Sequence, residues 1–313
     1  KIELGLDRVK QVWDRLRSLC GEISCPVIVV GGTNGKGSTV AYLEQFYLKC
    51  GWHTLAYTSP HVLDYNERIR LDGLSIDDAS LTEAFEQVEA SRETIRLTYF
   101  EFGTLTALYI ACMRSPDVLI LEVGLGGRLD AVNILQHDVA VITSIAMDHM
   151  EWLGNDLSAI ASEKAGIARQ GRPLIIGDRD MPESLYERAR AIGAKDLRVG
   201  RDYTVQLQAG GWDFRSGLNS YHDLPIPCMQ GSHQLNNAAA AIMAIECLRD
   251  ALPVTEACIR QGLNDTVLPG RFEQVATGPA IYLDVAHNPA ASAELHGILQ
   301  GFKDTGHLIA VFA

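Results

Sequence analysis

A glycine-rich loop between a strand pattern and a helix pattern constrains this chain more than any other stretch. The apolar run 27–30 leads into the loop 31–39 (Gly-Gly-Thr-Asn-Gly-Lys-Gly-Ser-Thr), and an apolar-periodic segment follows at 40–48. In that order, backbone N–H groups and a helix N-terminus converge on a polyphosphate. Lys36 would place its charge on the outer phosphates, and a following hydroxyl would lie near a metal ion. The loop therefore predicts nucleotide binding by Asn34, Gly35, Lys36, Gly37 and Ser38.

This loop departs from the standard phosphate-loop pattern G-x-x-x-x-G-K-[ST]. Gly37 follows Lys36 where a hydroxyl residue is expected, and Val30 stands where the first glycine belongs. The alternative is a glycine-rich turn that only connects a strand to a helix. A lysine among glycines at the head of a helix would be an odd choice for a connector, so we favour nucleotide binding.

Composition narrows the class of protein. A chain of 313 residues with 47% hydrophobic and 21% charged residues has the composition of a globular protein with room for more than one domain. Its formal net charge of −12 argues against nucleic acid as the main partner. Seven scattered cysteines without a C-x-x-C pair are expected to be reduced thiols. Without a membrane-span pattern or a signal-peptide pattern, we expect a cytoplasmic protein with no membrane contact.

Alternating strand and helix patterns predict an α/β fold with a doubly wound, mostly parallel sheet. Continuous apolar runs are typical of central parallel strands that are covered on both faces. Such runs occur at 27–31, 117–123, 139–145 and 173–176, with a further strand pattern at 53–58. Helical periods occur at 6–19, 77–93, 101–113, 157–168, 233–252 and 255–263.

The second half of the chain departs twice from the alternation of strand and helix patterns. Alternating residues around the Gly-Gly turn at 210–211 predict a small β-hairpin insertion at about 203–227. The segment 268–271 (Leu-Pro-Gly-Arg) resembles a hinge, and strand, helix and strand patterns follow at 281–284, 289–299 and 307–312. We expect a phosphate-loop domain at 1–272 and the start of a second, Rossmann-like α/β domain at 273–313. So small a unit cannot bury a useful core alone, so we expect it to be truncated here.

Polar residues follow three of the predicted strands. Ser59, Glu122 and His149 each come shortly after an apolar run. Because Mg²⁺ prefers oxygen ligands and commonly takes only one or two carboxylates, this set around a bound nucleotide predicts a Mg²⁺ site. For each residue alone, the alternative is a cap of the next element. Nearby, loop 124–127 (Gly-Leu-Gly-Gly) lacks the third glycine of a dinucleotide fingerprint, so we do not expect a nicotinamide site.

Three segments together carry a resemblance to a known family. They are 32–38 in the loop above, 122–130 (Glu-Val-Gly-Leu-Gly-Gly-Arg-Leu-Asp) and 284–289 (Asp-Val-Ala-His-Asn-Pro). They resemble the Mur ligase superfamily, most closely its folylpolyglutamate synthase and dihydrofolate synthase branch. The resemblance implies a monomeric ligase that uses ATP and Mg²⁺ to add L-glutamate to dihydropteroate and to reduced folates through an acyl phosphate. The domain at 273–313 would then begin the glutamate-binding part.

The resemblance also implies roles for single residues. Lys164, which by sequence alone is a solvated helix residue, matches the position of a lysine that CO₂ carboxylates so that it can approach a second Mg²⁺. His287 would orient the acyl phosphate or the incoming amine. The nucleotide contacts of the family correspond to Asn237, Arg271 and Asp284. Asn236 is the alternative to Asn237 for the nucleotide contact at this position. For Arg271, the alternative is a solvent-exposed charge in the linker with no contact to the nucleotide.

On the substrate side, segment 98–104 (Thr-Tyr-Phe-Glu-Phe-Gly-Thr) opens a helix. Aromatic side chains there could stack on a flat heterocycle, although core packing is the simpler role for Phe100 and Phe102. The segment resembles the pteroate-binding segment of the folate branch, where the loop at 122–130 also lies against the pterin. Pteroate contacts are therefore implied for Thr98, Tyr99, Phe100, Glu101, Leu129, Asp130 and Ala131.

Other functions fit less of the sequence. A peptidoglycan-precursor ligase would need a uridine-nucleotide domain before the loop, and only 31 residues precede Gly32. A nucleotide-hydrolysing switch protein would carry an N-K-x-D motif, which the sequence lacks, and would leave 284–289 unexplained. An enzyme with folylpolyglutamate synthase activity alone, or a phosphate-loop hydrolase that is no ligase, are the alternatives that we retain.

Overall fold

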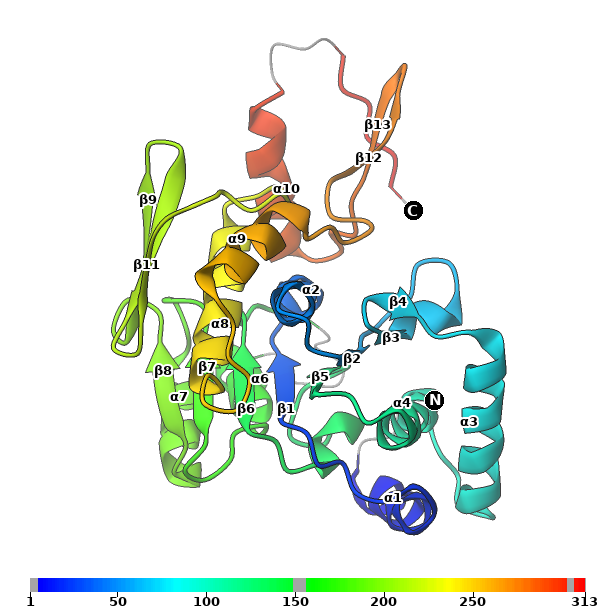
Figure 1. Cartoon of the computed structure of the whole chain (residues 1–313). Coiled ribbons are helices and arrows are strands. Elements are labelled where there is room, and N and C mark those ends of the chain that lie inside the picture. Colours follow the sequence, from blue (N-terminus) through cyan, green and yellow to red (C-terminus); the bar gives the residue numbers. More distant parts are fainter. Residues whose placement is uncertain (1–4, 149–155, 303–306, 313) are drawn as a thin grey trace.

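An eight-stranded sheet organises the fold (Figure 1), in the order β4-β3-β2-β5-β1-β6-β7-β8. This computed structural model describes residues 5–148, 156–302 and 307–312. The parallel part of the sheet consists of β2 (Thr54–Tyr57), β5 (Val118–Glu122), β1 (Val27–Gly31), β6 (Val139–Ile142), β7 (Pro173–Ile176) and β8 (Lys195–Arg198). Two short antiparallel strands, β3 (Ile69–Leu71) and β4 (Leu74–Ser75), extend one edge. The predicted doubly wound parallel sheet is confirmed.

Each face of the sheet supplies one hydrophobic core. Along β1, Val27 and Val29 belong to one buried cluster, whereas Ile28 and Val30 belong to the other, as the alternation of side chains along a strand requires. Helices cover both faces, which explains why β1 and β6 carry no polar side chain and why β5 is apolar up to Glu122 at its end. The first face carries α1 (Asp7–Cys20), α3 (Asp78–Arg92), α4 (Tyr99–Arg114), α6 (Leu157–Ala165) and α7 (Glu183–Ile192), and the second α2 (Lys36–Lys49), α8 (His233–Cys247) and α9 (Glu256–Asp265).

The insertion predicted as a hairpin is a three-stranded antiparallel sheet. It consists of β9 (Tyr203–Gln208), β10 (Gly211–Ser216) and β11 (Ser220–Leu224). Trp212 and Phe214 of β10 are fully buried in the same cluster as α8, so the small sheet is packed against the domain. The third strand, β11, was not predicted. The pairing of β10 with β11 shifts register between Trp212 and Phe214, and such a bulge breaks the regular alternation of side chains by which a strand is recognised in a sequence.

The C-terminal segment differs from the predicted α/β unit. Strands β12 (Glu273–Thr277) and β13 (Ala280–Leu283) pair with each other as an antiparallel hairpin, and α10 (Pro289–Gln300) follows. The prediction of a strand at 307–312 is wrong, because the structure assigns no secondary structure to these described residues. Val311 and Phe312 are 91% and 90% exposed, so no neighbouring strand covers them. Elsewhere too, no helix within the described ranges has the length and apolarity to cross a membrane.

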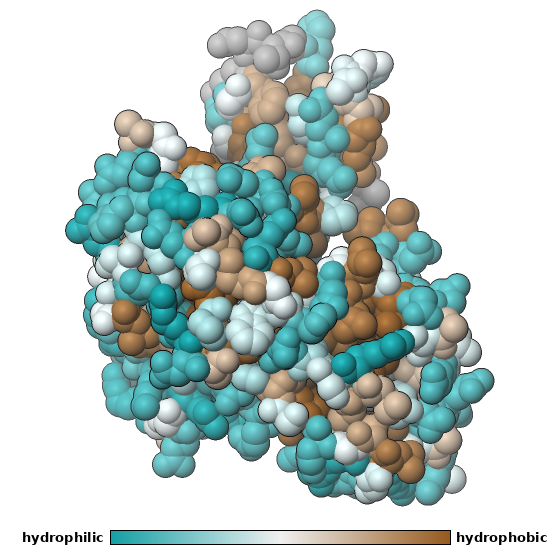
Figure 2. All heavy atoms as spheres, in the orientation of Figure 1, coloured by the Kyte–Doolittle hydropathy of each residue, from teal (hydrophilic) through white to brown (hydrophobic). Residues whose placement is uncertain are grey.

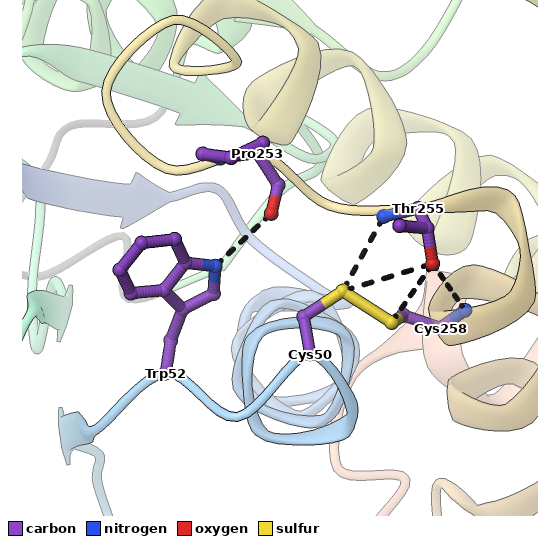
Figure 3. The surroundings of a disulfide bond; sticks show 5 residues. All are labelled: Cys50, Trp52, Pro253, Thr255 and Cys258. Carbon is purple, nitrogen blue, oxygen red and sulfur yellow. Dashed lines mark hydrogen bonds between the residues drawn. A yellow bond between two sulfur atoms is a disulfide. The ribbon is translucent and has the colours of Figure 1, made fainter.

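One pair of cysteines contradicts the expectation of reduced thiols. Cys50, at the end of α2, forms a disulfide with Cys258 of α9 (Figure 3). The N–H group of Thr255 donates a hydrogen bond to the Cys50 sulfur over 3.3 Å, and the Trp52 indole donates to the Pro253 carbonyl over 3.0 Å. The two cysteines are 208 positions apart, so their spacing in the sequence carries no signal that they meet.

Candidate active site

One cleft of about 1140 Å³ opens at the carboxyl ends of the parallel strands. Its walls are the loop after β1, the turn after β2, the loops after β5 and β6, and the segment that leads from α9 to α10. Every predicted site residue that the structure describes lines this cleft. His149, the third predicted Mg²⁺ ligand, lies outside the described residues. The position of the cleft is the one that a doubly wound sheet favours for ligands.

The loop after β1 needs its glycines for space as well as for conformation. Gly32 has φ +141°, and an added Cβ would lie 2.0 Å from the Thr143 hydroxyl oxygen. Gly35 has φ +85°, and an added Cβ would lie 2.4 Å from Oδ1 of Asn237. Because α2 begins at Lys36, the N–H groups of its first turn have no intrahelical acceptor and are available to an anion.

Asn237 rather than Asn236 contacts the phosphate loop. Its side chain is buried against Gly35, and its amide nitrogen donates to Oε1 of Gln234 over 3.2 Å. Gln234 in turn lies 3.4 Å from the hydroxyl of Ser38. Asn236 lines the same cleft, but the loop packs on its neighbour. This placement favours Asn237 over Asn236 for the predicted contact with the nucleotide.

Two lysines share one carbonyl oxygen of the loop. Lys36 donates from Nζ to the carbonyls of Gly32 (3.2 Å) and Thr33 (3.0 Å), and Lys164 donates to the Gly32 carbonyl over 2.8 Å. Lys164 is buried, so it is not the solvated helix residue of the simpler interpretation. Burial, with the charge of Lys36 as a second cause, lowers the pKa of Lys164 to about 7. A sizeable neutral fraction near pH 7 makes its amine a nucleophile, which carboxylation by CO₂ requires.

Glu122 and Ser59 meet at the ends of β5 and β2. The Ser59 N–H donates to Oε2 of Glu122 over 3.1 Å. Burial raises the pKa of Glu122, and the charges of Lys36 and Arg271 oppose that shift. Among the described residues, no group of three or more His, Cys, Asp or Glu side chains is arranged to hold a metal ion. A cation here would therefore complete its shell with phosphate and water, as Mg²⁺ commonly does.

The hinge segment 268–271 places the side chain of Arg271 at the cleft. Arg271 is half-buried, and this burial lowers its pKa, whereas the carboxylates of Glu122 and Asp284 act in the opposite direction. Asp284 holds the hinge, since Oδ2 accepts from the Phe272 N–H over 2.9 Å. Arg271 thus faces the carboxylate side of the cleft, which argues against a solvated linker charge. His287 is more open, and its Nε2 lies 3.8 Å from Oδ2 of Asp148.

Among the predicted pteroate residues, the two carboxylates differ from the two aromatic side chains in how they are held. Glu101 is already engaged, because its carboxylate accepts from the Thr98 N–H (2.7 Å) and from Arg8 (2.8 Å). Asp130 is likewise held by three N–H groups of its own loop, and burial raises its pKa to about 7. Tyr99 is 62% exposed, and Phe100 is half-buried with its ring against Gly124. The aromatic pair is therefore free to contact a flat ligand, whereas the carboxylates shape the wall.

Hydrophobic side chains gather beside this aromatic wall. Figure 2 shows them around β3 and β4, and the large exposed ones there include Val62, Leu63 and Leu74. Buried Arg68 has its guanidinium carbon 5.2 Å from the ring centre of Tyr99. Such a patch at the mouth of a cleft is typical of a ligand-binding surface.

Sequence reasoning missed two arginines of the cleft. Arg68 stacks on Tyr65 as well as on Tyr99, and Arg70 forms an ion pair of 2.9 Å with buried Glu44 of α2. Arg68 ends a short 3₁₀ helix (Tyr65–Arg68), whereas Arg70 lies on β3. Neither belongs to a motif that the sequence analysis singled out.

Comparisons with known proteins find relatives over nearly the whole chain. A family model described as the Mur ligase middle domain matches residues 30–245. The dihydrofolate synthase/folylpolyglutamate synthase of Escherichia coli (strain K12) is 41% identical over 310 residues, which cover 99% of this chain and 72% of that protein. The structure of E. coli FolC in complex with DHPP and ADP has a TM-score of 0.91 at 41% identity, covering 97% of this chain and 72% of that one.

A second solved structure adds other ligands. It is a bifunctional folylpolyglutamate synthase/dihydrofolate synthase with Mn, AMPPNP and L-glutamate bound. Its TM-score is 0.87 at 44% identity, and the match covers 96% of this chain and 72% of that chain.

Proposed function

The chain belongs to the Mur ligase family and, within it, to the dihydrofolate synthase/folylpolyglutamate synthases, and we propose that its cleft adds L-glutamate to dihydropteroate and to reduced folates with ATP. Its relatives are ATP-dependent ligases, and their structures hold ADP, AMPPNP, Mn and L-glutamate. The observation that carries the proposal is the convergence on one cleft of Lys36, Glu122 and Arg271 with an exposed aromatic wall. A nucleotide hydrolase without a second substrate would have no use for that wall.

The reaction has two steps. The carboxylate of the pterin substrate attacks the γ-phosphorus of ATP, ADP leaves, and an acyl phosphate forms. The neutral amino group of glutamate then attacks the acyl carbon, phosphate leaves with the electron pair of the broken C–O bond, and the surplus proton passes to solvent. Lys36, the N–H groups at the start of α2 and Arg271 neutralise the negative charge on the transferred group. We propose that His287, which lines the cleft, orients the acyl phosphate or the amine.

The residues present fit a divalent cation. Glu122 and Ser59 offer hard oxygen ligands at one end of the cleft, which leaves most of a coordination shell for phosphate and water. A cation bound there would neutralise charge on the phosphate oxygens. We further propose that Lys164, once carboxylated, serves a second ion, because a buried amine with a lowered pKa is reactive toward CO₂.

We also propose where the domains divide. The boundary at 272/273 falls between the hinge residues and β12, and Asp284 bonds back across it to Phe272. We assign the segment that begins at 273 to a glutamate-binding domain, and we propose that the protein works as a monomer in the cytoplasm. Limited digestion of the ligand-free protein is expected to cut first within 268–272.

Phosphate release from ATP by the complete protein tests the function. It is measured with dihydropteroate plus glutamate, with tetrahydrofolate plus glutamate, and with each component omitted. We expect release only when a pterin substrate and glutamate are both present, and with either pterin. Release with tetrahydrofolate plus glutamate, but not with dihydropteroate plus glutamate, would indicate folylpolyglutamate synthase activity only. Steady release without either substrate, or none in any mixture, would refute the ligase.

A further inference from the structure

Asn34 lies in the middle of the phosphate loop, yet its polar groups are bonded to protein. Its N–H donates to the Ser144 hydroxyl over 3.1 Å, and its carbonyl accepts from the Thr143 hydroxyl over 2.6 Å. Its side-chain amide pairs with that of Asn288: Oδ1 accepts over 2.9 Å and Nδ2 donates over 3.2 Å. These two bonds fix the side-chain amide of Asn34 at the wall of the cleft.

Asn288 comes from the far side of the hinge, 254 positions along the chain. It caps the N-terminus of α10, where its Oδ1 accepts from the Ala291 N–H over 2.9 Å. Its Nδ2 also lies 3.2 Å from Oδ2 of Asp148, in the loop after β6. The side chain is only 6% exposed, so breaking the amide pair would leave buried donors and acceptors unsatisfied.

Other bonds dock the same helix onto the domain. Glu294 of α10 accepts from Ser232 over 3.3 Å and lies 3.1 Å from Nδ1 of His233, at the start of α8. These contacts do not reach the phosphate loop. Among the side-chain hydrogen bonds of the described residues, the Asn34–Asn288 pair is thus the direct link between the start of α10 and the loop that would cradle the nucleotide.

We propose that Asn34 and Asn288 are positioning residues that couple the docking of α10 to the shape of the phosphate loop. The proposal rests on the proposed nucleotide site, and it gives Asn34 an indirect role instead of a direct contact with ATP. When α10 is docked, the amide pair fixes the Asn34 side chain and with it the conformation of the loop whose N–H groups would bind the phosphates. Because such coupling is reciprocal, nucleotide binding strengthens the docking of α10 by the same factor. The segment that carries Asp284 and His287 is thereby closed when the nucleotide is in place.

Substitutions at Asn288 separate this role from the helix cap. Asn288→Ser keeps a good N-cap for α10 but loses the amide pair, whereas Asn288→Ala loses both. Asp77→Ser, at the N-cap of α3 away from the cleft, is the control for a change of cap residue. We expect ADP to bind about ten-fold more weakly to Asn288→Ser and to Asn288→Ala, and with unchanged affinity to Asp77→Ser.

A double-mutant cycle tests whether the two residues act as a pair. ADP affinity is measured by calorimetry for the complete wild-type protein, for Asn34→Ser, for Asn288→Ser and for the double variant. We expect the double variant to bind no more weakly than either single one, because the pair is already broken in each. Hydrogen exchange in α10 gives a second readout: ADP should slow it in the wild-type protein and leave it unchanged in Asn34→Ser.

Each remaining outcome overturns the proposal in a distinct way. If Asn288→Ser binds ADP like the wild type while Asn34→Ser binds it weakly, Asn34 contacts the nucleotide itself and no coupling exists. If the losses of the two single variants add in the double variant, the residues act independently. If the wild-type protein does not bind ADP, the nucleotide site fails together with the coupling. A normal ADP affinity in all variants leaves the ligase intact and removes the coupling alone.

Discussion

At the scale of single residues, the burial of Lys164 has a consequence for the dependence of stability on pH. Its pKa is about 7 in the folded protein, against an ordinary value of 10.5. Between these values the unfolded chain binds more protons than the folded one. By linkage, the free energy of unfolding therefore rises as the pH rises from about 7 toward 10.5, and falls again on acidification.

The substitution Lys164→Met should abolish this contribution. From pH 7 to pH 9, we expect the wild-type protein to gain about 2 kcal/mol of unfolding free energy relative to the variant. Urea denaturation of both proteins at the two pH values measures the difference. Lys195→Met, at an exposed lysine, is the control and should follow the wild type. Parallel pH profiles for wild type and Lys164→Met would contradict the lowered pKa.

The phosphate loop offers a second test with a matched glycine. Gly35 has φ +85° and no room for a Cβ beside Asn237, whereas Gly51 has φ +83° and nothing within 4 Å. Both alanine variants should lose about 1 kcal/mol of stability from the backbone conformation. Only Gly35→Ala should also weaken nucleotide binding, by at least about ten-fold, because the loop must move off Asn237. Equal nucleotide affinities in the two variants would show that Asn237 does not shape the loop.

At the scale of elements, the disulfide joins the phosphate-loop helix α2 to α9, which precedes the hinge. The oxidised protein, unfolded without reductant, should titrate five free thiols instead of seven. Cys258→Ser should lower the unfolding free energy by about 2–4 kcal/mol under oxidising conditions and remove any effect of reductant. Cys228→Ser, at an exposed free thiol, is the control and should do neither. Seven reactive thiols would favour the reduced state predicted from the sequence.

At the scale of the whole molecule, the nucleotide is expected to bridge the hinge. Lys36 and Glu122 lie on the sheet domain, whereas Asp284 belongs to the segment beyond Arg271. A ligand that touches both parts stabilises the folded state by mass action, by about 2.7 kcal/mol at a hundred times its Kd. In a chain of this size, that corresponds to a rise in Tm of a few degrees.

This bridging should depend on Arg271. At one fixed ADP concentration, we expect Arg271→Ala to lose most of the rise in Tm that the wild type shows, since it removes a half-buried cation from the wall of the cleft. Differential scanning calorimetry with and without ADP measures the rise. Arg215→Ala, on the exposed face of β10, is the control. An undiminished rise in Arg271→Ala would place the arginine outside the nucleotide site.

Much of this arrangement follows from the sequence, because its signals are local. Apolar runs such as 117–123 predict buried parallel strands from their own composition, and glycines around Lys36 predict an anion-binding turn from their own conformational freedom. In a doubly wound sheet the strand ends meet at one edge, so Ser59 and Glu122 could be placed together without coordinates. Family resemblance then supplied Arg271, Asp284 and Lys164, which lack a local signal.

Tertiary structure alone decided what depends on contacts between distant parts of the chain. Three contacts join residues that are more than a hundred positions apart. They are the hydrogen bond of buried Lys164 to the phosphate loop, the disulfide between Cys50 and Cys258, and the pairing of Asn34 with Asn288. A side chain's solvation, charge state and hydrogen-bond partner are set by what the whole fold packs around it, and periodicity says nothing of that. The sequence by itself determined the central parallel strands, most of the helices and the phosphate loop, and packing decided what those elements place side by side.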